Sequence, residues 1–279
     1  MTKKLIRRLA PTTAVVCLLV SCGPAPAEQV TQTEDEASIS LRKAPTEALL
    51  LIDDSCSMNS PAAYLSCPRY ESAVGGTYPP GVYSNMDVVK AGLYGCEASS
   101  EGFLWRWRPE KLAMMRLNSS ASVQSPFDGS RAAHVSATLA LVPTYGTPLT
   151  TALRDAGAYI GSYFDDFNVR PSTPFVVVVI ADGQANGPPE TYDFACGAPY
   201  QFVDGSNPVP GARYIAKNEI ICALAGDQEV HVHTIAVGNG PPAFMQQMQD
   251  MAKAGGGSFA TVGHPVELSN RLLDIMLNP

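Results

Sequence analysis

The stretch Ala48-Leu49-Leu50-Leu51-Ile52-Asp53-Asp54-Ser55-Cys56-Ser57 decides the fold class. Its first five residues form a continuous apolar run, which is typical of a strand in a parallel sheet that is buried on both faces. A second and more strongly β-branched run, Phe175 to Ala181, also leads directly into an aspartate, Asp182. The same reasoning predicts a third strand at Val230 to Val237 and a weaker one at Lys111 to Leu117.

Helical periodicity accompanies these strands. Apolar side chains recur at three- and four-residue steps in three segments, Leu149 to Phe164, Phe244 to Met251 and Leu268 to Met276. Strands that alternate with helices predict an α/β fold with a doubly wound, mostly parallel central sheet flanked by helices. Two stretches rich in Pro, Gly, Ser and Tyr, Asn59 to Asn85 and Gln184 to Ala212, break this rhythm. We expect them to be long loop insertions after strand ends.

Residues 1–21 have the pattern of a secretory signal. A basic start precedes the mostly apolar segment Thr13 to Val20, which is far shorter than the ~20 residues of a membrane-spanning helix. The segment leads into Leu19-Val20-Ser21-Cys22. This sequence resembles the lipobox of bacterial lipoproteins, in which the signal is cut before the cysteine and that cysteine is acylated, for instance with palmitate. An ordinary signal peptide, cut after a small residue, is the alternative.

The lipobox resemblance implies a chain anchored in the bacterial cell envelope through lipid on Cys22, since no other apolar run is long enough to span a membrane. By resemblance to bacterial lipoproteins, Gly23 after the lipidated Cys is not the Asp that commonly marks inner-membrane retention, which favours the outer membrane. Residues 22–46 are rich in Pro, Ala, Thr, Glu and Ser, and we expect them to form a flexible tether. The folded domain is then expected over residues 47–279.

Composition and charge narrow the class of partner. The 279 residues are 46% hydrophobic and 16% charged, as in a soluble globular protein. The formal charge is −7, and loss of the 21-residue signal with its four basic side chains would leave 258 residues and a charge of −11. Proteins that bind nucleic acid normally carry an excess of basic residues. Nucleic acid is therefore not an expected partner.

Polar side chains that are suited to one site follow the predicted strands. Asp53, Ser55 and Ser57 occupy alternate positions after the first strand, and Asp182 follows the second. Thr147 lies in a loop just before the strongest predicted helix. Each residue also has a plain structural interpretation, such as a helix cap for Thr147 or a turn at Asp182. Because the carboxyl ends of parallel strands lie at one edge of a sheet, we expect these loops to meet there.

These five residues, in this chain order, resemble the metal-ion-dependent adhesion site of von Willebrand factor type A domains. That pattern is Asp-x-Ser-x-Ser, a Thr in a later loop and an Asp after a hydrophobic strand. The resemblance covers about residues 47–279. Its closing part includes the segments Met248 to Gly257, Ser258 to Val262 and His264 to Leu277, which look like the family's final helix, strand and helix.

The donor set and the resemblance together predict a function. Two carboxylates and three hydroxyls, with no thiolate or imidazole, form a hard oxygen shell that favours Mg²⁺ or Mn²⁺ over zinc or copper. Few of these ligands are charged, so the ion is expected to keep positive character. In the family, an open coordination position accepts a carboxylate from a partner protein. The resemblance therefore implies a membrane-anchored, metal-dependent binding protein that is not an enzyme.

Two other functions remain open. One is an exported hydrolase that uses the Asp/Ser/Thr cluster. A hydrolase of the subtilisin kind needs a serine nucleophile in a Gly-Thr-Ser-like motif, whereas this chain has Gly146-Thr147-Pro148. The other is a structural envelope protein with a vestigial metal site.

Five cysteines remain once Cys17 in the signal and Cys22 in the lipobox are set aside. An exported compartment permits disulfides, and five cysteines allow fifteen arrangements of two bridges. We favour Cys67 with Cys96 and Cys196 with Cys222, because each bridge would hold one long insertion. Cys56 would then be free inside the site loop, and a bond from Cys56 to another loop cysteine is the alternative.

Two further patterns have competing interpretations. His231 and His233 alternate on one strand, which is the geometry of a two-ligand metal site, but no third ligand is identifiable and we favour an exposed or edge-facing side of the strand. Trp105 and Trp107 interleave with arginines, as in some nucleic-acid-binding proteins. In so acidic a chain we expect an amphipathic strand or a partner-facing edge instead.

Overall fold

The computed structural model describes residues 47–62, 66–75, 82–97, 102–107, 111–117, 121–144, 149–167, 175–183, 192–195, 198–200 and 230–279. In chain order its elements are β1 (Glu47–Asp53), η2 (Cys56–Asn59), α1 (Pro68–Val74), α2 (Asn85–Tyr94), α3 (Phe103–Arg106), β2 (Leu112–Leu117), β3 (Ala121–Ser125), α4 (Arg131–Ala140), α5 (Leu149–Phe167), β4 (Phe175–Ala181), β5 (Tyr192–Ala195), β6 (Ala198–Tyr200), β7 (Val230–Val237), α8 (Pro242–Ala254), β8 (Gly256–Val262) and α9 (Pro265–Leu277). The predicted signal and tether lie outside the described residues.

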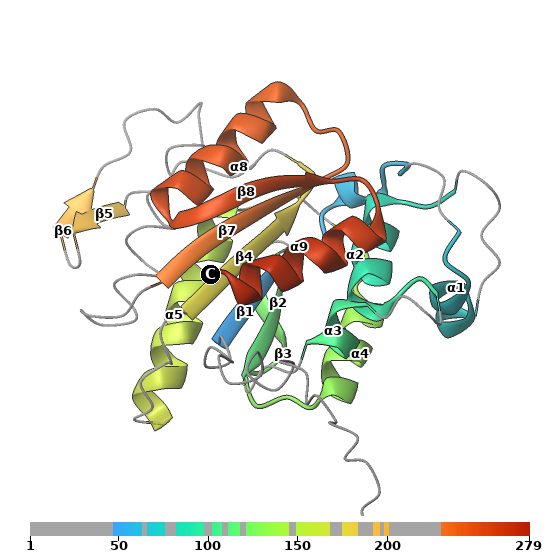
Figure 1. The fold of residues 1–279 in the computed structure, drawn as a ribbon. Coiled ribbons are helices and arrows are strands. Elements are labelled where there is room, and N and C mark those ends of the chain that lie inside the picture. Colours follow the sequence, from blue (N-terminus) through green and yellow to red (C-terminus); the bar gives the residue numbers. More distant parts are fainter. Residues whose placement is uncertain are drawn as a thin grey trace, which may run out of the picture. The chain divides into compact units, whose positions relative to one another are not determined.

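Six strands form one sheet in the order β3-β2-β1-β4-β7-β8 (Figure 1). All pairings are parallel except that of β2 with the edge strand β3. The chain leaves β1 toward β2 on one side and reaches β4 on the other, so the order of the strands reverses between β1 and β4. The loops after two strands at such a switch point diverge and leave a crevice for a ligand.

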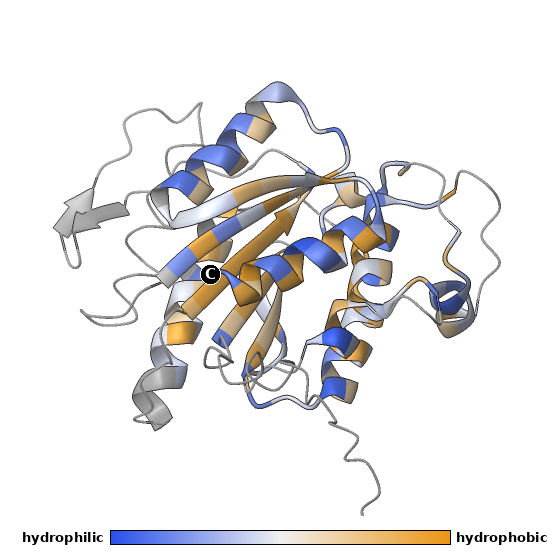
Figure 2. Cartoon of the chain, in the orientation of Figure 1, coloured by the Kyte–Doolittle hydropathy of each residue, from blue (hydrophilic) through white to orange (hydrophobic). Residues whose placement is uncertain are grey.

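Alternate residues of the central strands belong to two separate hydrophobic cores, one on each face of the sheet. Leu50 and Ile52 of β1 pack with α2 and α9 on one face of the sheet, while Leu49 and Leu51 pack with α5 and α8 on the other. Figure 2 shows the apolar colouring concentrated on the central strands, with polar residues on the outer sides of α8 and α9. Burial on both faces is why β1 and β4 are continuous apolar runs in sequence.

Side-chain caps set where the two helices of the first face begin. Ser84 accepts a hydrogen bond from the backbone of Asp87, whose carboxylate accepts one from the backbone of Ser84 in return. His264 and Glu267 make the same reciprocal pair at the start of α9. Both helices therefore start at fixed positions beside the sheet edge that carries the predicted site.

The predicted α/β fold is confirmed, with differences in the connections. The stretch Asn59 to Asn85 was predicted as a long loop, but its described part contains α1, which begins at Pro68 as first-turn prolines favour. The segment around Trp105 is the short helix α3 and not a strand, because Phe103 and Leu104 are both buried at consecutive positions. Within the described residues, no helix has the length and apolarity needed to cross a membrane.

Candidate metal centre

The carboxylates of Asp53 and Asp182 stand side by side at the switch point of the sheet. Asp53 is the last residue of β1, and Asp182 directly follows β4. The two strands are paired in register, with Ile52 opposite Ile180. The side chains of both aspartates are buried, with exposures of 0% and 7%. Two buried acidic groups thus lie at the same edge of the sheet. The sequence predicted this from the carboxyl ends of the two strands.

A chain of hydrogen bonds joins the two loops. Asp53 Oδ1 accepts a bond of 2.8 Å from the backbone N–H of Ser55. The hydroxyls of Ser55 and Ser57 lie 2.8 Å apart, and Ser57 Oγ donates to Asp182 Oδ1 at 2.6 Å. The structure therefore brings four of the five predicted site residues together. Thr147 lies outside the described residues.

The neighbouring loop is tied to this site through backbone. The backbone N–H of Thr144 donates to the carbonyl oxygen of Asp54 at 2.5 Å. Thr144 lies three residues before Thr147, so the segment that leads to Thr147 starts beside the site loop. The carboxylate of Asp54 itself is buried and lies 3.8 Å from the Arg116 guanidinium of β2.

Asn85 was missed by the sequence analysis. It is the first residue of α2 and is only 7% exposed, and its Nδ2 donates to Asp182 Oδ2 at 2.8 Å. Its Oδ1 would lie 2.9 Å from a Cβ at Gly238, whose φ of +75° also favours glycine. Ser84 followed three residues later by an acidic residue signals the start of this helix. No local pattern signals the contact with Asp182.

Burial sets the electrostatics of the centre. It raises the pKa of Asp53 to about 7, against the lowering effect of the hydrogen bonds from Ser55. The pKa of Asp182 is also raised by burial, while the bonds from Ser57 and Asn85 act in the opposite direction. Both carboxylates thus lack the water that normally stabilises their charge, and a cation would replace that stabilisation.

The donor set fits a hard divalent cation. Carboxylate and hydroxyl oxygens are the ligands that Mg²⁺ and Mn²⁺ accept, and Asp53, Ser55, Ser57 and Asp182 provide them at one place. Across the part of the chain that the structure describes, no three His, Cys, Asp or Glu side chains gather as a metal site. A thiolate- or imidazole-rich zinc centre is therefore not formed by those residues.

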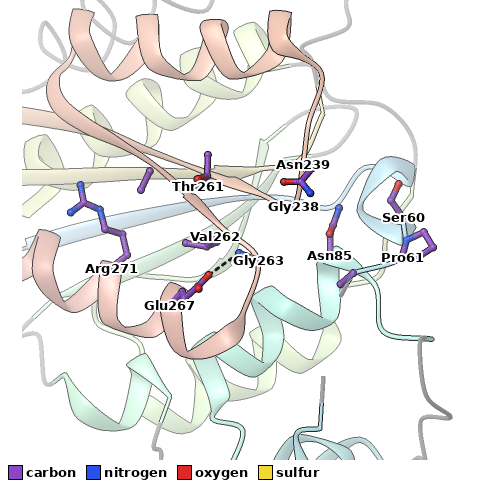
Figure 3. A pocket seen from close by; sticks show the side chains of 12 residues that line it. Ser60, Pro61, Asn85, Gly238, Asn239, Thr261, Val262, Gly263, Glu267 and Arg271 are labelled. Atoms are coloured by element: carbon purple, nitrogen blue, oxygen red, sulfur yellow. Dashed lines mark hydrogen bonds between the residues drawn. The ribbon is translucent and has the colours of Figure 1, made fainter. Parts of the chain in front are cut away.

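A cleft of about 580 Å³ begins where this cluster ends (Figure 3). Asn85 lies on its wall together with Gly238 from the end of β7. Glu267 and Arg271 of α9 form the opposite side, where the Glu267 carboxylate accepts the backbone N–H of Gly263. Asn85 is thus shared between the carboxylate cluster and the cleft.

The cysteine predictions fall partly within the described residues. Cys67 and Cys96 form a disulfide that joins the start of α1 to the residue after Gly95 at the end of α2. Cys56 is free and exposed in η2. Cys22, Cys196 and Cys222 lie outside the described residues.

The two histidines of β7 are held by β8. His231 Nδ1 lies 2.8 Å from the Gly256 carbonyl, and His233 Nδ1 lies 2.9 Å from Ser258 Oγ and accepts the Ser258 N–H at 3.1 Å. Each imidazole thus ties β7 to β8. The expected exposed or edge-facing position is wrong for His233, which is 3% exposed on a strand that lies between β4 and β8.

The comparisons with known proteins concern the fold. No protein-family model matches the chain, and no curated protein matches it. A mutant of the PilB minor pilin from Streptococcus sanguinis is 15% identical over 85% of this chain and 62% of that one, with a TM-score of 0.52. A von Willebrand factor type A protein from Catenulispora acidiphila is 15% identical over 84% of this chain and 42% of that one, with a TM-score of 0.47.

A protein of the mussel byssus gives a similar match. Proximal thread matrix protein 1 from the mussel byssus is 16% identical over 84% of this chain, with a TM-score of 0.48. The match spans 46% of that protein, so this chain corresponds to about half of its length. The mussel protein has also been solved with zinc in its metal-ion-dependent adhesion site. At these identities the likeness establishes the fold alone.

Proposed function

We propose that this chain is a metal-dependent binding protein of a bacterial cell envelope. In this proposal, lipid on Cys22 anchors the chain, with the outer membrane favoured over the inner. Asp53, Ser55, Ser57 and Asp182, completed by Thr147, hold Mg²⁺ or Mn²⁺. A bound cation would supply a positive charge with a coordination position open to an outside oxygen ligand, and a carboxylate of a protein partner would take that position.

The hydrogen bond from Ser57 Oγ to Asp182 Oδ1 carries the proposal. It joins two loops that are 125 residues apart in sequence and sets a hydroxyl and a carboxylate oxygen 2.6 Å from each other. Loops that only capped their own helices would have no reason to meet through a hydroxyl and a buried carboxylate. Their convergence beside the buried Asp53 is what a shared cation requires.

The same contacts favour binding over hydrolysis. A serine nucleophile is activated by a base that is itself oriented by a third group. In the described part of the chain, the Ser55 and Ser57 hydroxyls bond to each other and to Asp182, and no histidine contacts either. We therefore propose a role without catalysis.

Calorimetric titration of Mg²⁺ and Mn²⁺ into the purified chain tests the cation site. We expect saturable binding at one site, weakened at least about ten-fold in Asp53→Asn and in Asp182→Asn, because each variant removes a charged ligand without changing its size. Asp128→Asn is the matched control, since Asp128 is exposed in a turn after β3 and its loss changes the net charge equally. Absence of saturable binding by the unmodified chain would overturn the proposal and leave a structural envelope protein.

The carboxylate acceptor is tested separately. Bound Mn²⁺ enhances the relaxation of water protons while water occupies its open position. Added acetate is expected to lower that enhancement, whereas methylammonium at equal ionic strength is not. An enhancement that acetate leaves unchanged would mean that the cation has a structural role and does not capture carboxylates.

A further inference from the structure

Two arginines share one indole ring on the side of the domain where α1, α3 and α4 meet. The guanidinium of Arg69 lies 5.0 Å from the ring centroid of Trp105, and that of Arg131 lies 5.5 Å from it. Arg69 also lies 5.1 Å from the ring of Tyr94, which meets Trp105 edge to face. We call these four residues, Arg69, Tyr94, Trp105 and Arg131, the Arg–Trp cluster.

The Arg–Trp cluster is built from four separate elements, and its backbone is fixed. Arg69 follows Cys67 by two residues, and Cys67 is bonded to Cys96 beyond the end of α2. The backbone N–H of Arg69 donates to the Cys96 carbonyl at 2.9 Å. Trp105 comes from α3, and Arg131 is the first residue of α4. Both arginines therefore extend from backbone segments that are held in place by the fold.

Neither guanidinium has an acidic partner in the described part of the chain, where the ion pairs involve other basic residues. Stacking on an aromatic face leaves the N–H edges of a guanidinium free, and those edges match a carboxylate in a bidentate manner. Arg69 and Arg131 are partly exposed, so these edges can reach an outside ligand.

We propose that the Arg–Trp cluster is a docking point for an acidic segment of a protein partner. Two guanidiniums within about 10.5 Å of each other can bind carboxylates on neighbouring turns or on alternate residues of such a segment. Trp, Tyr and Arg are also the residues that contribute most to protein–protein binding. The net charge of −7 repels polyanions in general, so a local basic cluster of this kind selects a partner by position.

The cluster works without the cation of the proposed function. Its Tyr94 lies at the far end of α2 from Asn85, about 14 Å away at 1.5 Å per residue over nine residue steps. Binding at the cluster is therefore expected in the presence of a chelator. An absence of cation binding at the metal site can therefore be distinguished from an absence of ligand binding at the cluster.

A hexaglutamate peptide is the probe, titrated calorimetrically into the purified chain in neutral detergent with EDTA. We expect saturable binding, and a loss of at least about ten-fold in affinity in the double variant Arg69→Gln/Arg131→Gln. Lys253→Gln, at an exposed position of α8, is the charge control and is expected to change the affinity less than two-fold. Arg69→Lys/Arg131→Lys keeps the charge but removes the guanidinium N–H groups that bind a carboxylate in a bidentate manner. This variant is expected to lose most of the affinity.

Three outcomes would overturn the proposal. One is the absence of saturable binding of hexaglutamate. Another is an equal loss in Lys253→Gln, which would mean that the peptide responds to net charge alone. The third is tighter, cluster-dependent binding to detergent micelles that contain phosphatidylglycerol, which would assign the cluster to a membrane surface. Circular dichroism of each variant verifies that the fold is intact.

Discussion

Asn85 Nδ2 donates to Asp182 Oδ2 at 2.8 Å and so links the first residue of α2 to the residue after β4. The other oxygen of the same carboxylate accepts from Ser57 Oγ at 2.6 Å. Asp182 is thus held from two sides by donors on different loops. Its carboxylate cannot rotate without breaking one of the two bonds, so the orientation of this side chain depends on the position of α2.

The Asn85→Ala variant is expected to lower the free energy of unfolding by about 1–3 kcal/mol. It removes the donor from a carboxylate that is 7% exposed, and an unsatisfied buried acceptor costs about that much. Urea unfolding followed by circular dichroism measures the change. Gln246→Ala removes an exposed hydrogen bond to Asp250 and is expected to stay within about 0.5 kcal/mol. An equally small loss in Asn85→Ala would mean that the bond contributes little.

The effect of Asp53→Asn on stability is expected to depend on whether Mg²⁺ is present. Burial disfavours the charged form of Asp53, so a neutral isostere is expected to leave stability in EDTA unchanged or higher. With Mg²⁺ at a hundred times its Kd, the unmodified chain is expected to gain about 2.7 kcal/mol and the variant nothing. Thermal unfolding with and without Mg²⁺ measures both. An equal Mg²⁺ gain in the variant would argue against Asp53 as a ligand.

The central strands and the positions of the two aspartates could be predicted because burial on both faces leaves a direct trace in sequence. β1 and β4 are continuous apolar runs, and each leads straight into an acidic residue. The position of Asp182 beside Asp53 then follows from parallel pairing alone. This reasoning needs no side-chain detail, which is why it succeeds for Ser55 and Ser57 as well.

The contact of Asn85 could not be predicted because it depends on how far α2 extends along the sheet. The position of α2 along the sheet is set by the Ser84 cap and by packing against α9. Neither has a local signature at Asn85. The prediction of a strand around Trp105 was wrong for a related reason. Its alternation with arginines has the period of a strand, but burial of Phe103 and Leu104 favours one helical turn.

Loss of the disulfide between Cys67 and Cys96 is expected to cost about 3–4 kcal/mol of stability. The bridge spans 29 residues, and the entropy of closing a loop of that length in the unfolded chain gives this figure. The Cys67→Ala/Cys96→Ala variant in urea unfolding measures it. Cys56→Ala is the matched control, because Cys56 is exposed and unbridged, and little change is expected. A double variant as stable as the control would show that the bridge does not constrain the unfolded chain.

His233 is held neutral by its surroundings. Its imidazole is 3% exposed, and Nδ1 accepts the N–H of Ser258, which leaves no place for a second proton there. Burial, with smaller contributions from His231 and Arg271, lowers its pKa from 6.5 to about 4, while Asp274 acts in the opposite direction. In the unfolded chain the same imidazole takes up a proton at about pH 6.5.

This difference predicts a loss of stability on acidification. Between pH 6.5 and pH 4 the unfolded state binds a proton that the folded state does not, so the free energy of unfolding falls as the pH falls. From pH 7 to pH 4.5 the unmodified chain is expected to lose about 2 kcal/mol more than His233→Asn, which keeps an acceptor for Ser258. Urea unfolding at each pH measures the loss. His264→Ser, which removes an exposed histidine but keeps a capping side chain for α9, is expected to follow the unmodified chain. Parallel profiles for His233→Asn and the unmodified chain would mean that His233 is protonated in the folded state as readily as in the unfolded one.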